Sequence, residues 1–127
     1  MIQLKDLTLG YGQRILLDRV SAKLSEGGLI ALLGRNGSGK STLLRAIARL
    51  GEIASGEVLL NGKEISRLRP EELAKIISFV TTEKIRIPNL KCQDVVALGR
   101  APYTNWVGRL EARDREIVAQ SLALLDM

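Results

Sequence analysis

The sequence predicts an α/β fold in which an antiparallel β layer is attached to a strand, a glycine-rich loop and a helix. The first supporting observation is the segment 29–33, which is apolar at every position, as in a strand covered on both faces. The second is the glycine-rich segment 34–39, which separates that strand from a helical segment at 40–50. The third is the order of the other elements, because strands surround the loop and helices follow them.

The antiparallel layer is expected from two hairpin-like pairs of segments. Segment 2–9 carries regularly placed apolar residues and is expected to pair with 14–24 across the turn at Gly10-Tyr11-Gly12. A second hairpin is expected at 57–65, with Asn61-Gly62 at its turn, because both residues accept the positive φ that such a turn requires.

The second half of the chain is expected to be mainly helical. Pro70 opens a short helix, with acidic residues in its first turn. The segment 76–80 is rich in β-forming residues and is expected to be another strand. After a loop at 81–92, the segments 93–100 and 111–125 are expected to be helices.

Composition restricts the function classes only broadly. The chain has 127 residues, which is one modest domain or part of a larger one. Its 19 Lys and Arg against 14 Asp and Glu give a net charge of +5, which suits phosphate ligands, nucleic acid or an anionic membrane face. The charges are spread along the chain, so most are expected on solvated helix faces. Because there is no histidine, a mechanism that requires one cannot be completed within these residues.

Cysteine usage and hydropathy indicate a soluble chain from a reducing compartment. Cys92 is the only cysteine, so no intrachain disulfide can form, and we expect it to be a small buried apolar residue. Lys5 and Asp6 interrupt the first apolar stretch, so no signal peptide is expected. No apolar run approaches the roughly 20 residues that span a bilayer, although the chain can still dock on a membrane protein.

The glycine-rich loop and the start of its helix satisfy the Walker A motif G-x-x-x-x-G-K-[ST]. Its glycines let successive backbone N–H groups surround phosphate oxygens, and the helix directs its positive end at the same anion. Lys40 is expected to reach the β- and γ-phosphates as the catalytic residue, the Ser41 hydroxyl to ligate Mg²⁺, and Thr42 to hydrogen-bond phosphate. The alternative is a glycine-rich turn with a surface lysine, which the strand-loop-helix context disfavours. The expected nucleotide-binding residues of this loop and helix are Gly34, Asn36, Gly37, Ser38, Gly39, Lys40, Ser41 and Thr42.

Segments around the loop resemble those of the ATP-binding-cassette (ABC) ATPases. The resemblance is carried by Leu7–Gly12, Val20-Ser21, Ala31–Leu44, Ser55–Val58 and Asn61-Gly62, and by the spacings between them. It implies a P-loop NTPase fold of the ABC type, with an antiparallel β subdomain and the start of a helical subdomain. It also implies that the aromatic ring of Tyr11 stacks on adenine, whereas the alternative is an ordinary turn tyrosine.

The resemblance covers all 127 residues and implies the N-terminal portion of one ATPase domain, with an incomplete core. In this portion, 1–33 and 56–80 correspond to the β-rich nucleotide-binding part, and 34–50 to the Walker A loop and helix. The region 88–127 corresponds to a helical part that faces the membrane-spanning subunits.

A finer resemblance lies at 94–103 and 106–110, which resemble the corresponding segments of the ABC importers that handle iron-siderophores, haem or cobalamin. The aliphatic residues of this region are expected in the core. Tyr103 and Trp106 are expected either to fill the core or to be interface anchors, since aromatic residues are common at binding hot spots.

One departure from the family concerns the metal site. ABC ATPases usually carry a glutamine after the strand that corresponds to 76–80, and this glutamine touches Mg²⁺ and senses the γ-phosphate. This chain has Thr81-Thr82-Glu83-Lys84 there, so Thr82 or Glu83 takes the place of the glutamine, depending on a one-residue shift. We hypothesise that Glu83 is the metal ligand, and the alternative is a solvated loop glutamate.

A second departure is that these residues lack the family's signature motif, Walker B aspartate, catalytic glutamate and switch histidine. Phosphoryl transfer to water requires a residue that positions the nucleophile, so this chain is expected to bind ATP without hydrolysing it. The apolar segment 29–33 is expected to expose apolar surface and an unpaired strand edge, and the chain is expected to self-associate.

The resemblance therefore implies the ATP-binding subunit of an ABC importer, which as a full-length protein couples ATP binding and hydrolysis to uptake of iron-siderophore, haem or cobalamin. Its expected ligands are ATP and Mg²⁺. Its expected partners are polytopic membrane permease subunits and a second ATPase subunit, with no direct contact to nucleic acid, at the cytoplasmic face of the membrane. The alternatives are a soluble ABC ATPase that acts on nucleic acid or the ribosome, another phosphate-loop enzyme such as a kinase, and a binding module without hydrolysis.

Overall fold

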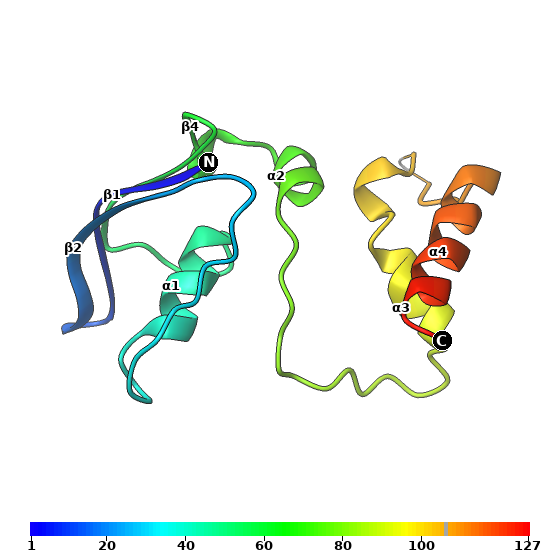
Figure 1. Cartoon of the computed structure of the whole chain (residues 1–127), viewed down its shortest axis with the longest axis horizontal. Coiled ribbons are helices and arrows are strands. Elements are labelled where there is room, and N and C mark those ends of the chain that lie inside the picture. The colour runs from blue at the N-terminus through cyan, green and yellow to red at the C-terminus, as the bar shows by residue number, and fades with distance from the viewer. Residues whose placement is uncertain (106) are drawn as a thin grey trace. The chain divides into compact units, whose positions relative to one another are not determined.

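The computed structural model describes residues 1–127 except Trp106. The chain divides into two units, Met1–Leu73 and Ala74–Met127. The first unit contains the β-sheet and the helix α1, and the second contains α3 and α4 (Figure 1).

The sheet of the first unit has four antiparallel strands in the order β2-β1-β3-β4. The strands are β1 (Ile2–Tyr11), β2 (Arg14–Leu24), β3 (Ser55–Leu60) and β4 (Lys63–Glu64). Both expected hairpins are therefore present, and the second turns at Asn61 and Gly62, whose φ angles are 49° and 80°. The first strand extends beyond the expected end at Leu9, because Gly10 and Tyr11 still pair with residues of β2.

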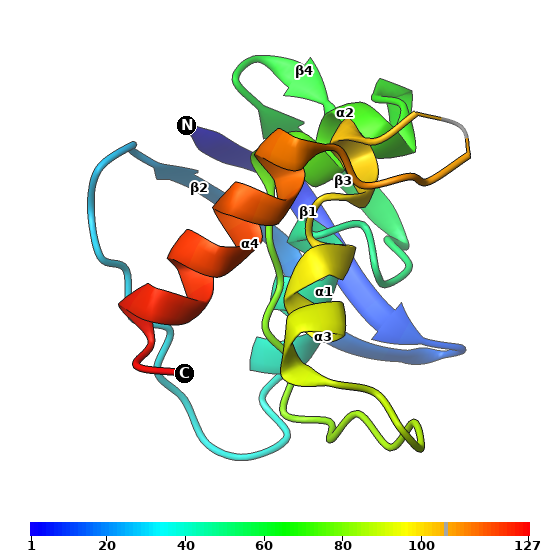
Figure 2. The same cartoon turned by 90° about the vertical axis from the view of Figure 1, so that its right-hand side faces the viewer.

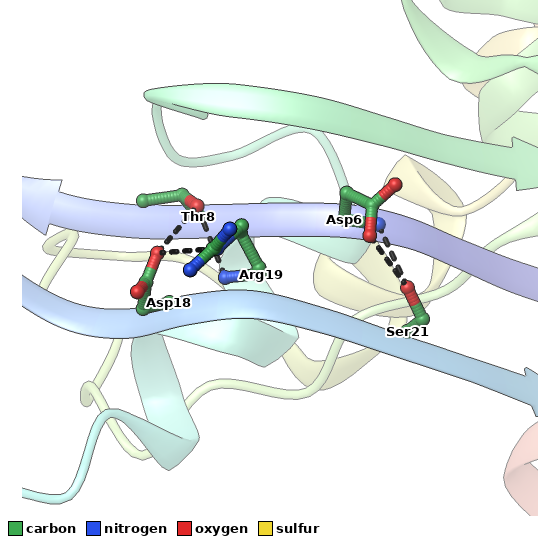
Figure 3. A network of polar contacts seen from close by, with 5 residues as sticks. All are labelled: Asp6, Thr8, Asp18, Arg19 and Ser21. Carbon is green, nitrogen blue, oxygen red and sulfur yellow. Dashed lines mark hydrogen bonds and ion pairs between the residues drawn. The ribbon is translucent and has the colours of Figure 1, made fainter.

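Three register shifts interrupt the β1–β2 pair, and polar side chains bond the backbone at the first two (Figure 3). Asp6 and Arg19 lie at these two shifts, with φ angles of 44° and 45°. The Asp6 amide donates to Ser21 Oγ at 2.9 Å, and the Arg19 amide donates to Thr8 Oγ1 at 3.1 Å. The Thr8 hydroxyl in turn donates to Asp18 Oδ1 at 3.4 Å. These bonds satisfy backbone donors that the interrupted ladder leaves unpaired.

The core of the first unit lies between the sheet and the helices around it. Helix α1 (Lys40–Ile47) contacts β1 and buries Ala46, while the 3₁₀ turn η1 (Ile65–Arg67) follows β4. Leu7 and Leu9 of β1 and Val58 of β3 are the largest fully buried side chains. The central position of β1 between β2 and β3 explains why this strand supplies more buried apolar residues than any other element.

The expected strand at 29–33 is absent, which is a correction to the sequence prediction. The segment contains neither helix nor strand, and its apolar side chains face solvent, with Leu29 102% and Leu33 89% exposed. A strand requires a hydrogen-bonded neighbour, and no described segment pairs with this one. The expected exposure of apolar surface here is confirmed.

The expected strand at 76–80 is also wrong. Ile76 is instead the last residue of helix α2 (Pro70–Ile76), which begins at the expected proline, and 77–91 contains no helix or strand. Local β propensity again proves insufficient without a paired neighbour, because what stabilises a strand is its packing and its pairing.

The second unit is built on two helices that lie side by side, α3 (Cys92–Leu98) and α4 (Ala112–Leu124), with the 3₁₀ turn η2 (Ala101–Tyr103) after α3 (Figure 2). Both expected helices are confirmed; α3 begins one residue earlier and ends two residues earlier than expected, and α4 is one residue shorter at each end. Cys92 is exposed at the first residue of α3, so the expectation that it is buried is wrong. A position in the first turn of a short helix leaves its thiol outside the helix pair. None of the described helices has the length and apolar character needed to cross a membrane.

A buried ion pair joins the segment after α3 to the start of α4. Arg100 Nε lies 2.7 Å from Asp114 Oδ1, and the two side chains are only 18% and 7% exposed. The Asp114 carboxylate also accepts a hydrogen bond from the Glu111 amide at 3.0 Å. The bond from Arg100, followed by that from the Glu111 amide, lowers the pKa of Asp114.

Tyr103, one of the two aromatic residues that the sequence singles out in this region, lies at the surface. The Tyr103 ring is half-exposed, with the Arg100 guanidinium 4.1 Å and the Lys75 ammonium 5.2 Å from its centroid. Tyr103 is therefore held at the surface by two cations and does not fill the core. Trp106, the other expected anchor, lies outside the described residues.

Candidate functional site

The glycine-rich loop adopts a conformation that two of its glycines make possible. Gly37 and Gly39 have φ angles of 82° and 91°, a region that other residues rarely enter. Gly39 is the residue that caps the N-terminus of α1, and its carbonyl accepts the first helical hydrogen bond, from the Leu43 amide at 2.8 Å. The loop itself turns through a bond from the Ser38 amide to the Arg35 carbonyl at 3.1 Å.

The two ends of the loop lie against neighbouring side chains. A Cβ atom on Gly34 would lie 2.7 Å from Ser38 Oγ, so the Ser38 side chain would have to move. A Cβ atom on Gly39 would lie 3.4 Å from Leu17 Cγ and 3.5 Å from Leu16 Cβ, so the loop meets strand β2 there. The second contact brings the end of the β1–β2 hairpin next to the start of α1.

Lys40 folds back over the loop that precedes it. Its ammonium donates to the Gly34 carbonyl at 2.7 Å and to the Arg35 carbonyl at 2.8 Å. The side chain is therefore held across the loop at the N-terminus of α1, the end where free backbone N–H groups and the helix dipole favour an anion. No acidic residue lies in the first turn of α1 to oppose such a ligand.

A pocket of about 630 Å³ lies between the hairpin end and the loop. Its volume is in the range of small-molecule and nucleotide sites. The residues that line it come from both strands of the hairpin, from the loop and from the first turn of α1: Tyr11, Arg14, Leu16, Asn36, Gly37, Gly39, Lys40, Ser41 and Thr42.

The structure brings together most residues that the sequence singles out. Tyr11, at the end of β1, lines the same pocket as the Walker A residues, although it lies far from them in the sequence. Gly34 and Ser38 do not line the pocket, but they shape the loop that does.

Sequence reasoning misses two lining residues, Arg14 and Leu16. Arg14 pairs directly with Tyr11 across the hairpin, because the turn lies at 12–13 and not at the expected Gly10-Tyr11-Gly12. Leu16 lies at a register shift in the β1–β2 pair, which a sequence pattern does not reveal.

Oxygen ligands for a metal are present only in part. The Ser41 hydroxyl lines the pocket and is a hard oxygen ligand of the kind that Mg²⁺ accepts beside waters and phosphate oxygens. Among the described residues, no group of three or more Asp, Glu, Cys or His could hold a metal ion by itself. Glu83 lies in the second unit, in the segment between α2 and α3, and its role as a metal ligand stays a prediction.

Comparison with known families decides what kind of protein carries this pocket. The model of the family described as ABC transporter matches residues 17–127. The chain belongs to the ABC transporter family. The resemblance inferred from the Walker A segment and its surroundings is therefore confirmed.

The most similar curated proteins include ATP-binding proteins of ABC transporters. An uncharacterized ABC transporter ATP-binding protein of Methanocaldococcus jannaschii is 40% identical over 95% of this chain and 42% of its own length. The probable siderophore transport system ATP-binding protein YusV of Bacillus subtilis is 36% identical over 95% of this chain and 44% of its own. The ferric enterobactin transport ATP-binding protein FepC of Escherichia coli is 33% identical over 93% and 44%. The chain thus spans less than half the length of these relatives.

Solved ABC cassettes share the fold. The dimeric structure of MJ0796, a bacterial ABC transporter cassette, matches the whole of this chain and 58% of its own, with a TM-score of 0.80 and 30% identity. The same cassette in a post-hydrolysis state bound to ADP and Pi matches with a TM-score of 0.76 and 29% identity. The expected fold class is confirmed: the chain is part of an ABC-type P-loop NTPase, with an antiparallel sheet and the beginning of a helical region.

Proposed function

We propose that this chain is the nucleotide-binding part of an ABC importer ATPase that takes up an iron chelate. The observation that carries the proposal is the pocket in which Tyr11 faces the same space as Lys40, Ser41 and Thr42. An aromatic ring at one end suits a nucleobase, and a cation with free helix N–H groups at the other suits phosphates. Adenine on Tyr11 therefore places the triphosphate over the loop.

Each group at the phosphate end has a distinct task in this proposal. Lys40 leaves the Gly34 and Arg35 carbonyls and bonds the β- and γ-phosphates, where it stabilises the charge that develops during phosphoryl transfer. Backbone N–H groups of the loop and of the first turn of α1 bind the remaining oxygens. Ser41 would hold Mg²⁺, which would supply positive charge against the phosphates, and Glu83 is the proposed second protein ligand. The residues proposed to contact nucleotide are Tyr11, Gly34, Asn36, Gly37, Ser38, Gly39, Lys40, Ser41 and Thr42.

Hydrolysis and transport belong to the whole protein. We propose that the full-length ATPase hydrolyses ATP as a dimer bound to polytopic permease subunits, peripheral to the inner face of the cell membrane. The names of the relatives that handle siderophores support an iron-chelate cargo, with haem and cobalamin as related candidates. We assign 1–33 and 56–80 to the β-rich nucleotide part, 34–50 to the Walker A loop and helix, and 88–127 to the permease-facing part.

The Lys40→Ala substitution tests the nucleotide site. Titration calorimetry of the chain with Mg-ATP is expected to show at least a tenfold loss of affinity, because a hydrogen bond to a charged group contributes about 1.5–3 kcal/mol. Lys63→Ala is the matched control, since Lys63 lies in β4 and does not line the pocket. Unchanged ATP affinity in Lys40→Ala would overturn the assignment of the pocket.

The transport proposal is tested with the full-length protein in vesicles that contain its permease. Uptake of a ferric siderophore is expected to require ATP and to be lost with Lys40→Ala. ATP turnover that responds to nucleic acid and not to the permease would instead indicate a soluble ABC ATPase.

A further inference from the structure

Arg14 is a second cation of the nucleotide pocket, and the Walker A motif gives it no role. It is the first residue of β2 and pairs directly with Tyr11, the last residue of β1. Side chains of directly paired residues lie on the same face, roughly 5 Å apart at Cβ. Both side chains accordingly line the pocket.

The guanidinium of Arg14 is available to a ligand. Among the described residues, no group forms an ion pair or hydrogen bond with it, and the side chain is exposed. Other arginines of the chain do have acidic partners in the structure: Arg19 with Asp18, Arg67 with Glu64, Arg69 with Glu72, and Arg100 with Asp114. The five N–H donors of Arg14 are thus open to a ligand in the pocket.

The charge of the lining points to an anion near Arg14. Arg14 and Lys40 are the two cationic residues that line the pocket, and no aspartate or glutamate lines it. The two cations come from different walls, Arg14 from the hairpin end and Lys40 from the start of α1. A guanidinium binds phosphate oxygens in a forked geometry, whereas a neutral adenine offers it no charge to pair with.

We propose that Arg14 binds the α-phosphate of the nucleotide. This inference rests on the proposed function, in which Tyr11 takes the base and Lys40 the β- and γ-phosphates. In a nucleoside triphosphate the α-phosphate is the phosphate nearest the base. A cation that shares the hairpin end with Tyr11 is therefore nearest to this group, and Lys40 is nearest to the other two.

The position of Arg14 predicts how its loss changes the affinities for adenosine and for its mono-, di- and triphosphates. If Arg14 binds the α-phosphate, its loss weakens AMP, ADP and ATP by about the same factor and leaves adenosine unaffected. A contact to the base or ribose would weaken adenosine as well. A contact to the terminal phosphates would weaken ATP far more than AMP.

The experiment compares Arg14→Gln with wild type in displacement of a fluorescent ATP analogue by adenosine, AMP, ADP and ATP. Arg14→Gln is expected to weaken the three nucleotides about tenfold each, the effect of one charge-assisted hydrogen bond. Arg14→Lys keeps the charge without the fork and is expected to lose less. Arg19→Gln is the matched control on the same strand, because Arg19 does not line the pocket. Thermal melting of each variant verifies that the sheet is intact.

The outcomes separate this inference from the proposed function. Loss of adenosine binding in Arg14→Gln, or equal affinities of Arg14→Gln and wild type for AMP, would overturn the role of Arg14. If Lys40→Ala also bound ATP normally, the nucleotide site as a whole would be wrong. If Lys40→Ala lost ATP while Arg14→Gln kept every affinity, only the role of Arg14 would fail.

Discussion

At the scale of single residues, the pocket depends on backbone conformations that glycine adopts without strain. Gly39 is one of these positions, because its φ angle is 91°, and a Cβ atom there would be in van der Waals contact with Leu17 and Leu16. It caps α1 and also forms part of the pocket wall. A side chain at this position would therefore disturb both the start of the helix and the space for the ligand.

We expect Gly39→Ala to lower the free energy of unfolding of the first unit by about 1–3 kcal/mol, the cost of a left-handed backbone at a non-glycine residue. ATP affinity is expected to fall with it. Chemical denaturation followed by circular dichroism measures the first effect, and calorimetry the second. Gly28→Ala is the control, since a Cβ there meets nothing within 4 Å and its φ is not in the left-handed region. Equal stability of the two variants would contradict the assignment of strain to Gly39.

How well single residues are predicted depends on whether their role is encoded locally. The Walker A residues are recognisable because the motif requires fixed spacing within one segment, and the structure places most of them around one pocket. The burial of Cys92 is predicted wrongly, because burial depends on tertiary packing that the identity of a single residue does not determine. Arg14 enters the pocket through pairing with Tyr11, which becomes visible only when the hairpin register is known.

At the scale of elements, the helices and hairpins follow from short-range signals and the missing strands do not. Asn61-Gly62 and Pro70 mark a turn and a helix start through their own backbone preferences, and both elements form where expected. The segments 29–33 and 76–80 have strand-like composition, yet neither is a strand. Strand formation needs a partner from elsewhere in the sequence, so composition alone cannot guarantee it.

The ion pair at the start of α4 makes the second unit sensitive to acid. Because Arg100 and the Glu111 amide lower the pKa of Asp114, the folded state binds the proton more weakly than the unfolded state does. The stabilisation is present above the unfolded pKa, near 4, and is lost as the pH falls through the lower folded value.

We therefore expect Asp114→Asn to melt at a lower temperature than wild type at pH 7, because it leaves the Arg100 charge without its partner. The difference between the two melting temperatures is expected to narrow as the pH falls below about 4, because the unfolded wild-type chain then takes up a proton on Asp114. It is expected to reach its minimum below the lower folded pKa, where the folded wild type also loses the carboxylate. Helical circular dichroism recorded from pH 7 to pH 2 measures this. Asp126→Asn serves as the control, since Asp126 is exposed after the end of α4. A constant difference across the whole pH range would refute the linkage to Asp114.

At the scale of the whole molecule, one segment exposes several large apolar side chains in succession. In the run 29–33, Leu29, Ile30, Leu32 and Leu33 are all exposed, and no described strand pairs with their backbone. Open backbone groups beside apolar side chains are a template for association with another chain. Because no described strand pairs with it, a segment with the composition of a buried strand lies in solvent here.

We expect the 127-residue chain to self-associate through this run, with an apparent mass that rises with concentration in sedimentation velocity experiments. The double substitution Leu29→Ser and Leu33→Ser is expected to shift the population toward monomer. A control double substitution, Val80→Ser and Leu98→Ser, removes two exposed apolar residues that do not form a run. A monodisperse wild-type monomer, or equal effects of both double substitutions, would show that the run is not the contact.

The bonds that Lys40 makes within its own loop contribute to the measured affinity of the chain for nucleotide. The ammonium already occupies two carbonyl acceptors, so an arriving phosphate competes with the protein backbone for the same cation. Binding is then an exchange: the loop gives up two internal hydrogen bonds, and its released carbonyls must be solvated again. The measured affinity is the difference between these two sets of bonds. Alanine at this position removes the two bonds within the loop and also the bonds to phosphate. The substitution is therefore expected to loosen the loop as well as to weaken nucleotide binding.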